Sequence, residues 1–248
     1  MPFGAASVVR RLDSARANRF LAALPASGYA LLAPHLRMVS LERGTVLHDA
    51  GESFEQVYFP HSGMVSLVTI LRNGAMVETA TLGRAGVIGA TAGLGARHAI
   101  GRAVVQLPGA ASRLPFSRFH AAAQKSDAIR NLVVCYNDLL IAQIQQSVAC
   151  NAMHSLEARF CRWLLQSQDC VSSDTIPLTQ EFLGQMLGVR RTSVTLAARL
   201  LQSAGMIRYR RGHIQIVDRP ALEEAACECY AVIREHTDKV FPLAEGLE

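Results

Sequence analysis

Residues 178–207 read LTQEFLGQMLGVRRTSVTLAARLLQSAGMI, the pattern of two short helices joined by a tight turn. Apolar side chains recur at helical intervals over residues 180–187, and Thr179 can cap the first turn. Gly188 ends this helix, because glycine adopts a left-handed cap at little cost. Gly184 costs about 1 kcal/mol relative to alanine within a helix. Its presence therefore indicates that a second segment passes too close for a side chain.

A second amphipathic run covers about residues 192–203 and ends before Gly205. Two helices joined so closely form a helix-turn-helix, whose second helix enters the DNA major groove with its first turn on base edges. An ordinary helical hairpin with solvated arginines is the alternative, and the spacing of Gly184, Gly188 and Val194 favours DNA binding. The residues expected on the buried face of the second helix are Val194, Ala197, Ala198, Leu200 and Leu201.

Residues 207–216 predict a small hairpin whose arginines reach DNA phosphates and complete a winged motif. Residues 176–217 contain six arginines and one acidic residue, Glu181, in a chain of net charge +5. A basic patch confined to one segment is the electrostatic footprint expected for binding to double-stranded DNA. The candidate DNA-binding residues are Thr179, Gln180, Arg190, Arg191, Thr192, Ser193, Thr195, Arg199, Arg208, Arg210 and Arg211.

The composition is that of a globular protein with room for two cores, since half of the 248 residues are hydrophobic. No apolar run is long enough to cross a membrane, and the N-terminus lacks the order of a signal peptide. We therefore expect a cytoplasmic protein with no membrane partner. All six cysteines lie in the second half without tandem C-x-x-C spacing, which favours reduced thiols.

The middle of the chain, residues 116–176, has neither glycine nor proline and is expected to be helical. Its apolar stripe predicts a long helix over about residues 123–151 that pairs with a copy of itself, packing on its own domain being the alternative. Pairing is favoured because a two-fold dimer presents two recognition helices to successive major grooves. The candidate dimerisation residues are Ile129, Leu132, Tyr136, Leu139 and Ile144.

Residues 37–115 read as short β-rich runs separated by glycines, which predicts an antiparallel barrel or roll. Asn73-Gly74 lies between two runs and predicts a type I′ turn within a hairpin over residues 64–82. Other expected strands cover residues 57–59, 86–88 and 103–107.

The expected fold class is α+β. It comprises an N-terminal antiparallel β-roll of the double-stranded β-helix kind (1–122), a dimerisation helix (123–155) and a C-terminal winged helix-turn-helix domain (156–248). This order of elements resembles the Crp/Fnr family of bacterial transcription regulators over about residues 18–217, most specifically in residues 63–89 and 178–207. The resemblance implies a homodimer that binds palindromic promoter sites and contacts RNA polymerase.

Residue roles follow from the same resemblance. Arg191 matches the arginine that reads guanine, which suits the bidentate geometry of a guanidinium on O6 and N7. Arg190 and Ser193 match phosphate-contacting positions, and Gln180 falls where the first helix meets the DNA backbone. Thr192 and Leu196 stand where cyclic-AMP-responsive members have a glutamate and a base-reading arginine. The preferred DNA site is therefore expected to differ from theirs.

The sensor half departs further from the family pattern. In cyclic-nucleotide-binding members a Gly-Glu-Leu turn holds the ribose and an Arg-Ser or Arg-Thr pair holds the phosphate. The corresponding positions here are Gly89-Ala90-Thr91 and Arg102-Ala103, where neither alanine can bond the ligand. We therefore expect a regulator that does not depend on cyclic AMP, with no cofactor and with an unknown small-molecule effector or none. Iron-sulfur members need N-terminal cysteines, and the first cysteine here is Cys135.

No enzymatic motif is present: the chain lacks a phosphate-binding loop, a nucleophile elbow and paired catalytic carboxylates. His48 and His61 are isolated, unlike the ligands of a cupin. Cys227 and Cys229, with His213 and His236 elsewhere, could bind zinc or respond to oxidation. Two thiols one residue apart on a helix point to different sides, however, so no metal site is expected. The alternative function is a ligand-binding or thiol-redox-responsive interaction module with a vestigial helix-turn-helix.

Overall fold

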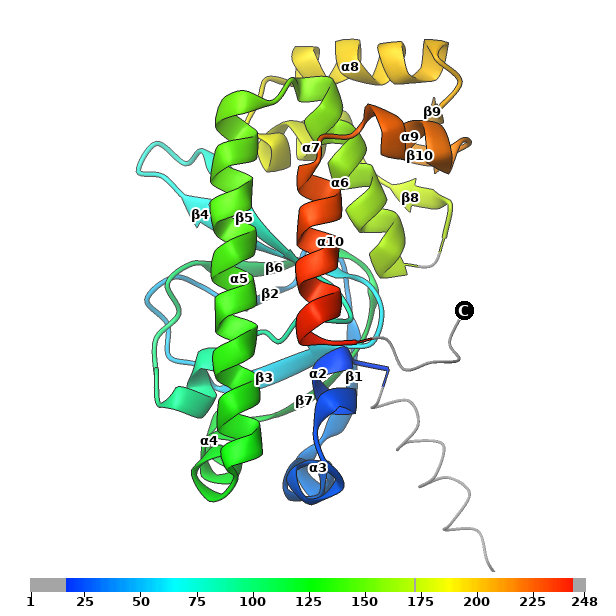
Figure 1. The fold of residues 1–248 in the computed structure, drawn as a ribbon. Coiled ribbons are helices and arrows are strands. Elements are labelled where there is room, and N and C mark those ends of the chain that lie inside the picture. Colours follow the sequence, from blue (N-terminus) through cyan, green and yellow to red (C-terminus); the bar gives the residue numbers. More distant parts are fainter. Residues whose placement is uncertain (1–16, 172, 243–248) are drawn as a thin grey trace, which may run out of the picture.

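The computed structural model describes residues 17–171 and 173–242. The extreme N-terminus, on which the signal-peptide expectation rests, and the outer ends of the two expected terminal domains lie outside these ranges. An antiparallel β-rich half, a long helix and a helical C-terminal half follow one another along the chain (Figure 1). The α+β fold class predicted from the sequence is confirmed.

The N-terminal half is a roll of two antiparallel sheets. One sheet has the order β1-β7-β3, from Arg37–Leu41, Gly109–Pro115 and Gln56–Pro60. The other has the order β2-β6-β4-β5, from Val46–His48, Arg102–Leu107, Met64–Ile70 and Met76–Leu82. Apolar side chains from both sheets meet in one buried cluster, which contains Leu41, Val65, Leu82, Ile88, Ala103, Val105 and Ala111.

Strands β4 and β5 form the predicted hairpin, with Ile70 opposite Met76. Its turn is not of type I′, because Gly74 has a φ of 81° whereas Asn73 does not have a positive φ. The Gly74 amide donates to the Leu71 carbonyl over 2.9 Å, as in a type I turn followed by a left-handed glycine. The expected strand at 86–88 is absent from the described fold. Ile88 makes only an isolated bridge to Tyr58, next to a turn closed between Gly86 and Gly83.

Helices cover one side of the roll and carry a second core. They are α2 (Arg19–Ala23), α3 (Ala26–Leu32), η1 (Ala33–His35), η2 (Ala90–Leu94), α4 (Phe116–Lys125) and the long α5 (Asp127–Met153). Ser126 ends the α4–α5 link and caps α5 by accepting from the Ile129 amide. The predicted long helix is thus present, beginning four residues later than the expected start at 123.

The apolar side chains of α5 lie on two faces of the helix. Most of the residues predicted to form the dimer lie on the face that packs against the core of their own chain. Ile129, Tyr136 and Leu139 are buried in the core of their own chain, and Leu132 packs against that core. Ile144 is half-buried. The exposed apolar residues are instead Val134, Ile141 and Val148, which are 45%, 53% and 66% exposed. The set of dimerisation residues expected from the sequence therefore needs correction.

The C-terminal half begins with α6 (Leu156–Val171) and contains a small sheet of order β8-β10-β9. Helix α7 spans Gln180–Leu187, the predicted bounds, and α8 spans Arg191–Ser203, one residue more than expected. The wing hairpin is β9 (Ile207–Arg210) and β10 (His213–Ile216), as predicted. The third strand, β8 (Thr175–Pro177), was not anticipated. Helices α9 (Arg219–Ala225) and α10 (Cys229–Val240) complete the described chain.

The two halves pack directly on each other. Met64, Val68 and Leu107 of the roll share one buried cluster with Trp163 and the helix-turn-helix core. The Trp163 indole donates to Glu78 Oε1 over 3.1 Å. Helix α10 returns alongside α5, as Figure 1 shows in red and green. Among the described helices, none combines the length and apolar character needed to span a bilayer.

Candidate nucleic-acid interface

The turn between α7 and α8 is built by two glycines, as the sequence predicts. Gly188 has a φ of 67° and ends α7 in the left-handed conformation. A Cβ atom at Gly184 would lie 2.9 Å from the Val189 carbonyl oxygen, closer than packing allows. Only glycine therefore lets the turn fold back on the first helix, which sets how α8 is presented.

Polar side chains of the motif divide between holding the helices and facing solvent. The Thr179 hydroxyl accepts from the Phe182 amide over 3.3 Å and caps α7. The Thr195 hydroxyl donates to Gln180 Oε1 over 2.8 Å and so ties α8 to α7. These two threonines thus position the motif, while the amide nitrogen of Gln180 is the part suited to donate to a phosphate.

The start of α8 gathers the residues expected to meet DNA. Arg190 is the N-cap residue and Arg191 the first helical residue, and both are exposed together with Thr192. Ser193 is half-buried. The positive end of a helix dipole lies at the same place, which favours contact with phosphate oxygens.

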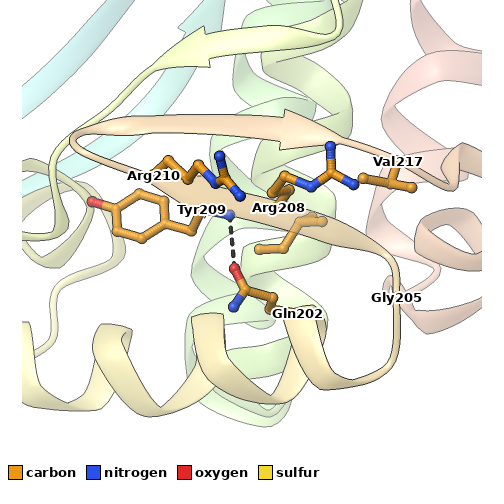
Figure 2. Close-up of a pocket in the computed structure, with 7 residues that line it drawn as sticks. Gln202, Gly205, Arg208, Tyr209, Arg210 and Val217 are labelled. Carbon is orange, nitrogen blue, oxygen red and sulfur yellow. Dashed lines mark hydrogen bonds between the residues drawn. The ribbon is translucent and has the colours of Figure 1, made fainter.

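The wing is attached to α8 by its tyrosine. The Tyr209 amide donates to Gln202 Oε1 over 2.9 Å, as Figure 2 shows. The Tyr209 hydroxyl donates to the Leu178 carbonyl over 3.3 Å. Because side chains alternate along a strand, Arg208 and Arg210 lie on the opposite face of β9 from Tyr209. Arg211, with a φ of 45°, and Gly212 form the turn. The strand that carries Arg208 and Arg210 is therefore fastened to α8.

The six arginines of the interface are all exposed. None of them forms an ion pair with any residue in the ranges 17–171 and 173–242. Arg208 makes a hydrogen bond, but with the neutral side chain of Gln215. No ion pair within the described residues thus neutralises the positive charge of this surface, which suits it to bind a polyanion. The six residues are Arg190, Arg191, Arg199, Arg208, Arg210 and Arg211.

The apolar face of α8 is narrower than expected. Val194, Ala197, Ala198 and Leu201 are buried as predicted. Leu200 was expected to be buried as well, but its side chain is 51% exposed. A helix turns by about 100° per residue, which places Leu200 just beyond the face of α8 that packs on α7. Leu196 is 59% exposed, so its side chain faces outward rather than into the protein.

The corresponding ligand positions of the roll lie on η2 and at the start of β6. Gly89, with a φ of 82°, caps η2, whose first residue Ala90 is buried, and Thr91 is half-buried. Arg102 binds both carboxylate oxygens of Asp49, with Nε 3.2 Å from Oδ1 and a terminal nitrogen 2.5 Å from Oδ2. This hydrogen bonding lowers the pKa of Asp49. The only arginine at these ligand positions therefore already has an anionic partner.

The histidines singled out in the sequence lie apart from one another. His48 packs edge-on against Phe54, and His61 is buried in the roll. Burial lowers the pKa of both imidazoles. His213 lies on the wing and His236 on the groove between α5 and α10, so neither joins Cys227 and Cys229.

Sequence comparison divides the chain in the same way as the structure. Residues 38–126 match the family described as the cyclic nucleotide-binding domain. Residues 158–225 match the family described as the Crp-like helix-turn-helix domain. A comparison with curated proteins gives no match.

Solved structures with the same fold include several transcription regulators. FixK2 from Bradyrhizobium japonicum has a TM-score of 0.66 at 15% identity, covering 77% of this chain and 98% of that one. A putative Crp/Fnr regulator from Eubacterium rectale has a TM-score of 0.63 at 18% identity, covering 82% and 94%. The c-di-GMP-responsive regulator CLP from Xanthomonas campestris has a TM-score of 0.61 at 14% identity, covering 77% and 99%.

Proposed function

The chain is a transcription regulator of the Crp/Fnr type, and from this premise we propose that it acts as a homodimer on a palindromic promoter site. The observation that carries the proposal is the surface of six exposed arginines on α8 and the wing, none of which has an acidic partner in the described chain. Membership of this family adds RNA polymerase as the proposed protein partner.

Within this surface we assign base reading to the first turn of α8. Arg191 is the residue proposed to contact a guanine, and Thr192 and Leu196 face the same groove from the exposed side of the helix. Arg190, Ser193 and Gln180 are assigned to phosphates, together with Arg199 and the wing arginines. Base contacts would specify the site, while the phosphate contacts would supply most of the affinity and its salt dependence.

The DNA-binding assignment is tested by fluorescence anisotropy on an operator identified by genome-wide footprinting, with a random duplex as comparison. The wild-type chain should bind both, with affinity for each falling as salt rises and with a clear preference for the operator. A chain with a vestigial motif, the alternative function, would show no salt-dependent binding to either duplex. The double variant Arg190→Ala, Arg191→Ala should lose the preference while remaining folded, because both side chains are exposed.

We propose that the dimer forms through the exposed face of α5. Val134, Ile141 and Val148 follow one another at seven-residue intervals, the spacing of a coiled-coil seam. The opposite face of the helix is occupied by the core of its own chain, and α10 lies along another side. A second copy of α5 is therefore the occupant that fits this stripe, and its two-fold axis would place two α8 helices symmetrically.

Sedimentation of the double variant Ile141→Glu, Val148→Glu tests this dimer. The wild-type chain should sediment as a dimer at micromolar concentration, whereas the variant should be monomeric and bind the operator weakly. Val46→Glu, an equally simple change at an exposed valine of the roll, is the control and should leave the dimer intact. A dimeric double variant would place the interface elsewhere, and a monomeric wild-type chain would refute the homodimer.

We further propose that cyclic AMP is not the effector. Ala90 and Ala103 supply no polar atom from their side chains, and Arg102 is engaged by Asp49. Polar groups of a nucleotide left unpaired in the roll would cost about 1–3 kcal/mol each. Calorimetric titration with cyclic AMP, cyclic GMP and cyclic di-GMP, alongside operator binding with each, is the test. Micromolar affinity for cyclic AMP together with stronger operator binding would overturn the proposal.

A further inference from the structure

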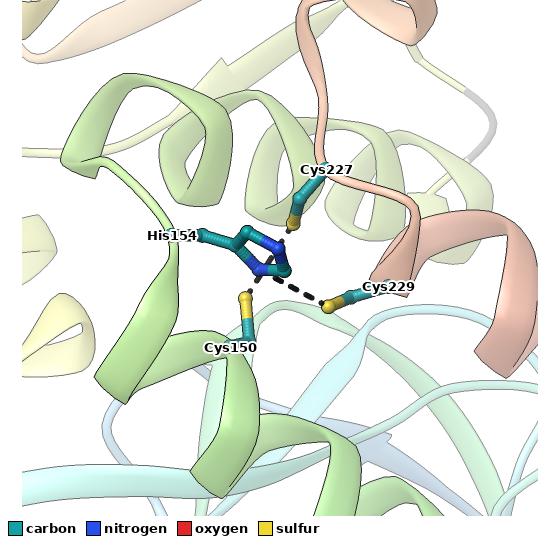
Figure 3. A group of neighbouring side chains, drawn as sticks. All are labelled: Cys150, His154, Cys227 and Cys229. Carbon is teal, nitrogen blue, oxygen red and sulfur yellow. Dashed lines mark hydrogen bonds between the residues drawn. The ribbon is translucent and has the colours of Figure 1, made fainter.

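Four potential metal ligands meet where α5 ends and α10 begins. Cys150 lies in the last turn of α5 and His154 is its C-cap residue, while Cys229 is the first residue of α10 and Cys227 precedes it (Figure 3). Their Sγ atoms and a ring nitrogen of His154 all lie within 4.8 Å of one another. The sulfur atoms of Cys150 and Cys227 are 3.5 Å apart, and Cys229 Sγ is 3.4 Å from His154 Nδ1.

The expectation that Cys227 and Cys229 point to different sides is wrong, because the two residues do not share a helix. Helix α9 ends at Ala225, and Ala226 is extended with a ψ of 153°. Cys227 therefore lies in the link, and both thiols turn toward α5. On α5 itself, Cys150 and His154 are four residues apart and so project from the same side of the helix end.

We propose that Cys150, His154, Cys227 and Cys229 form a zinc(II) site. Thiolate sulfur and imidazole nitrogen are the ligands that this ion selects, and a closed set of four protein ligands is typical of structural zinc. Bond lengths of about 2.3 Å to sulfur and about 2.0 Å to nitrogen give tetrahedral edges of about 3.5–3.8 Å. The Cys150–Cys227 distance of 3.5 Å and the Cys229–His154 distance of 3.4 Å already lie near these edges, so an ion can enter with small movements.

Ordinary packing accounts poorly for this arrangement. Buried cysteines usually act as small apolar residues among other apolar side chains. Here the three thiols form a separate cluster in which the only further apolar residue, within the described chain, is the partly buried Ala158. They contact one another and a histidine rather than the large cores on either side.

Groups around the cluster supply what a zinc site requires from its surroundings. Glu228 Oε1 lies 3.2 Å from His154 Nε2, so the other ring nitrogen, Nδ1, faces the sulfur atoms. The Gln146 side-chain amide donates a hydrogen bond to Cys229 Sγ over 3.0 Å. Such outer contacts orient metal ligands. Three thiolates and one neutral imidazole around zinc(II) leave one negative charge. The buried guanidinium groups of Arg159 and Arg162 lie near enough to interact electrostatically with Cys150 and can balance it.

The position of the site suggests what the ion does. All four ligands fall outside residues 38–126 and 158–225, the segments that match the two family domains. They lie at the junction where α5 passes into α6, and the ion would fasten the start of α10 to that junction. Zinc would thus hold the junction between α5, the proposed dimerisation helix, and the DNA-binding half in one position.

The test begins with the full-length chain purified under reducing conditions. After reconstitution with zinc and gel filtration, mass spectrometry of the elements should find one zinc per chain. Replacement by cobalt(II) should give the sulfur-to-cobalt charge-transfer band and the intense visible bands of a tetrahedral site with several thiolates. This spectrum is read on the wild-type chain, so it does not depend on any variant folding.

Variants then assign the ligands. Cys229→Ser and His154→Gln should lose the bound ion, and circular dichroism reports whether each still folds. Cys135→Ser, the same change at an exposed cysteine on α5, is the matched control and should retain it. Glu228→Gln should weaken zinc binding about 10–100-fold without abolishing it.

Three results would overturn the proposal. The first is a reduced wild-type chain that binds no zinc and shows no tetrahedral cobalt spectrum. The second is unchanged zinc content in folded Cys229→Ser and His154→Gln chains, which would place the ion elsewhere. The third is a Cys150–Cys227 disulfide in a chain that still takes up no metal after reduction, which would make the cluster a thiol pair instead.

Discussion

The roll and the DNA-binding half treat positive charge in opposite ways. Arg102 of the roll is held by both oxygens of Asp49, and its neighbour Ala103 belongs to a buried cluster of apolar side chains. The arginines of α8 and the wing face solvent without an acidic partner among the described residues. The same residue type is thus structural in one half and available to a ligand in the other.

The difference between Arg102 and Arg191 lies in whether a carboxylate is close to the guanidinium group, and not in the place of the arginine in its sequence motif. Arg102 stands at the place where family resemblance puts a phosphate-binding arginine, yet Asp49, 53 residues away in sequence, already binds its guanidinium group. Arg191, the arginine proposed to read a base, forms no ion pair with any carboxylate of the described chain. One ion pair within the roll is therefore enough to engage the arginine that the family resemblance assigns to a ligand.

The largest effect should come from placing one new charge in each half. Ala103→Asp puts an unpaired carboxylate in the roll interior, where it should lower the free energy of unfolding by about 3–5 kcal/mol. Thr192→Asp, exposed on α8, should change it by no more than about 0.5 kcal/mol. Urea denaturation measures both. Equal losses in the two variants would remove the contrast between the halves.

Removing the proposed base-reading arginine should have the next largest effect. Arg191→Ala is expected to weaken operator binding by about 1–3 kcal/mol and to relax base preference at one position of each half-site. Anisotropy titrations on the operator and on single-base variants of it measure this change. A loss of the same size on random DNA would show that Arg191 contacts phosphate instead.

A wing arginine should have a smaller and less selective effect. Arg210→Ala should weaken binding to every duplex alike and lower the slope of log affinity against log salt by about one. Arg102→Ala removes an equal charge from the roll and should leave both affinity and slope unchanged, since Arg102 is already paired. A change in slope for Arg102→Ala would contradict the division of roles between the two halves.

The smallest effect concerns a histidine that the roll keeps neutral. Burial lowers the pKa of His61 from its ordinary value of 6.5, so the unfolded chain takes up the proton first as pH falls. Its contribution to stability is therefore complete above about pH 6.5 and is lost as pH drops toward the lowered pKa. His61→Gln should lose less stability than wild type between pH 7 and about pH 5.

Unfolding curves at several pH values measure the His61 effect as a difference between the two chains. His213→Gln, the same substitution at an exposed position of the wing, is measured alongside as the control. A wild-type chain and a His61→Gln chain with parallel pH profiles would show that His61 is not held neutral by its surroundings.

The parts that the sequence predicted well are those governed by local rules. Gly184, Gly188 and the periodicity of residues 180–187 specify the helix-turn-helix through backbone conformation and close approach, which depend on neighbours in sequence. The wing follows from the alternation and turn around Arg211 and Gly212 in the same way.

The parts that it missed depend on contacts distant in sequence. Helix α5 is apolar on two faces, and no pattern within it states which face the roll will cover. The apolar stripe therefore predicts Tyr136 and Leu139 at a dimer seam, whereas the fold buries both and exposes Ile141. The ion pair between Asp49 and Arg102 likewise cannot be predicted from the spacing of apolar residues. The cysteine cluster was missed because Cys150 and His154 lie 77 and 75 residues from their partners. The sequence did contain one signal for a metal site. Cys150 precedes His154 by four residues at the end of a predicted helix.

Phe241, near the end of the described chain, is fully buried against Phe20 and Tyr136, and Asp238 binds Arg19 over 2.8 Å. The core beneath the roll therefore contains residues from both ends of the described chain. During synthesis the sensor half cannot complete its packing until the DNA-binding half has left the ribosome, although domains usually fold in N-to-C order. The two halves are therefore expected to complete their folding together, which makes the core beneath the roll sensitive to truncation from either end.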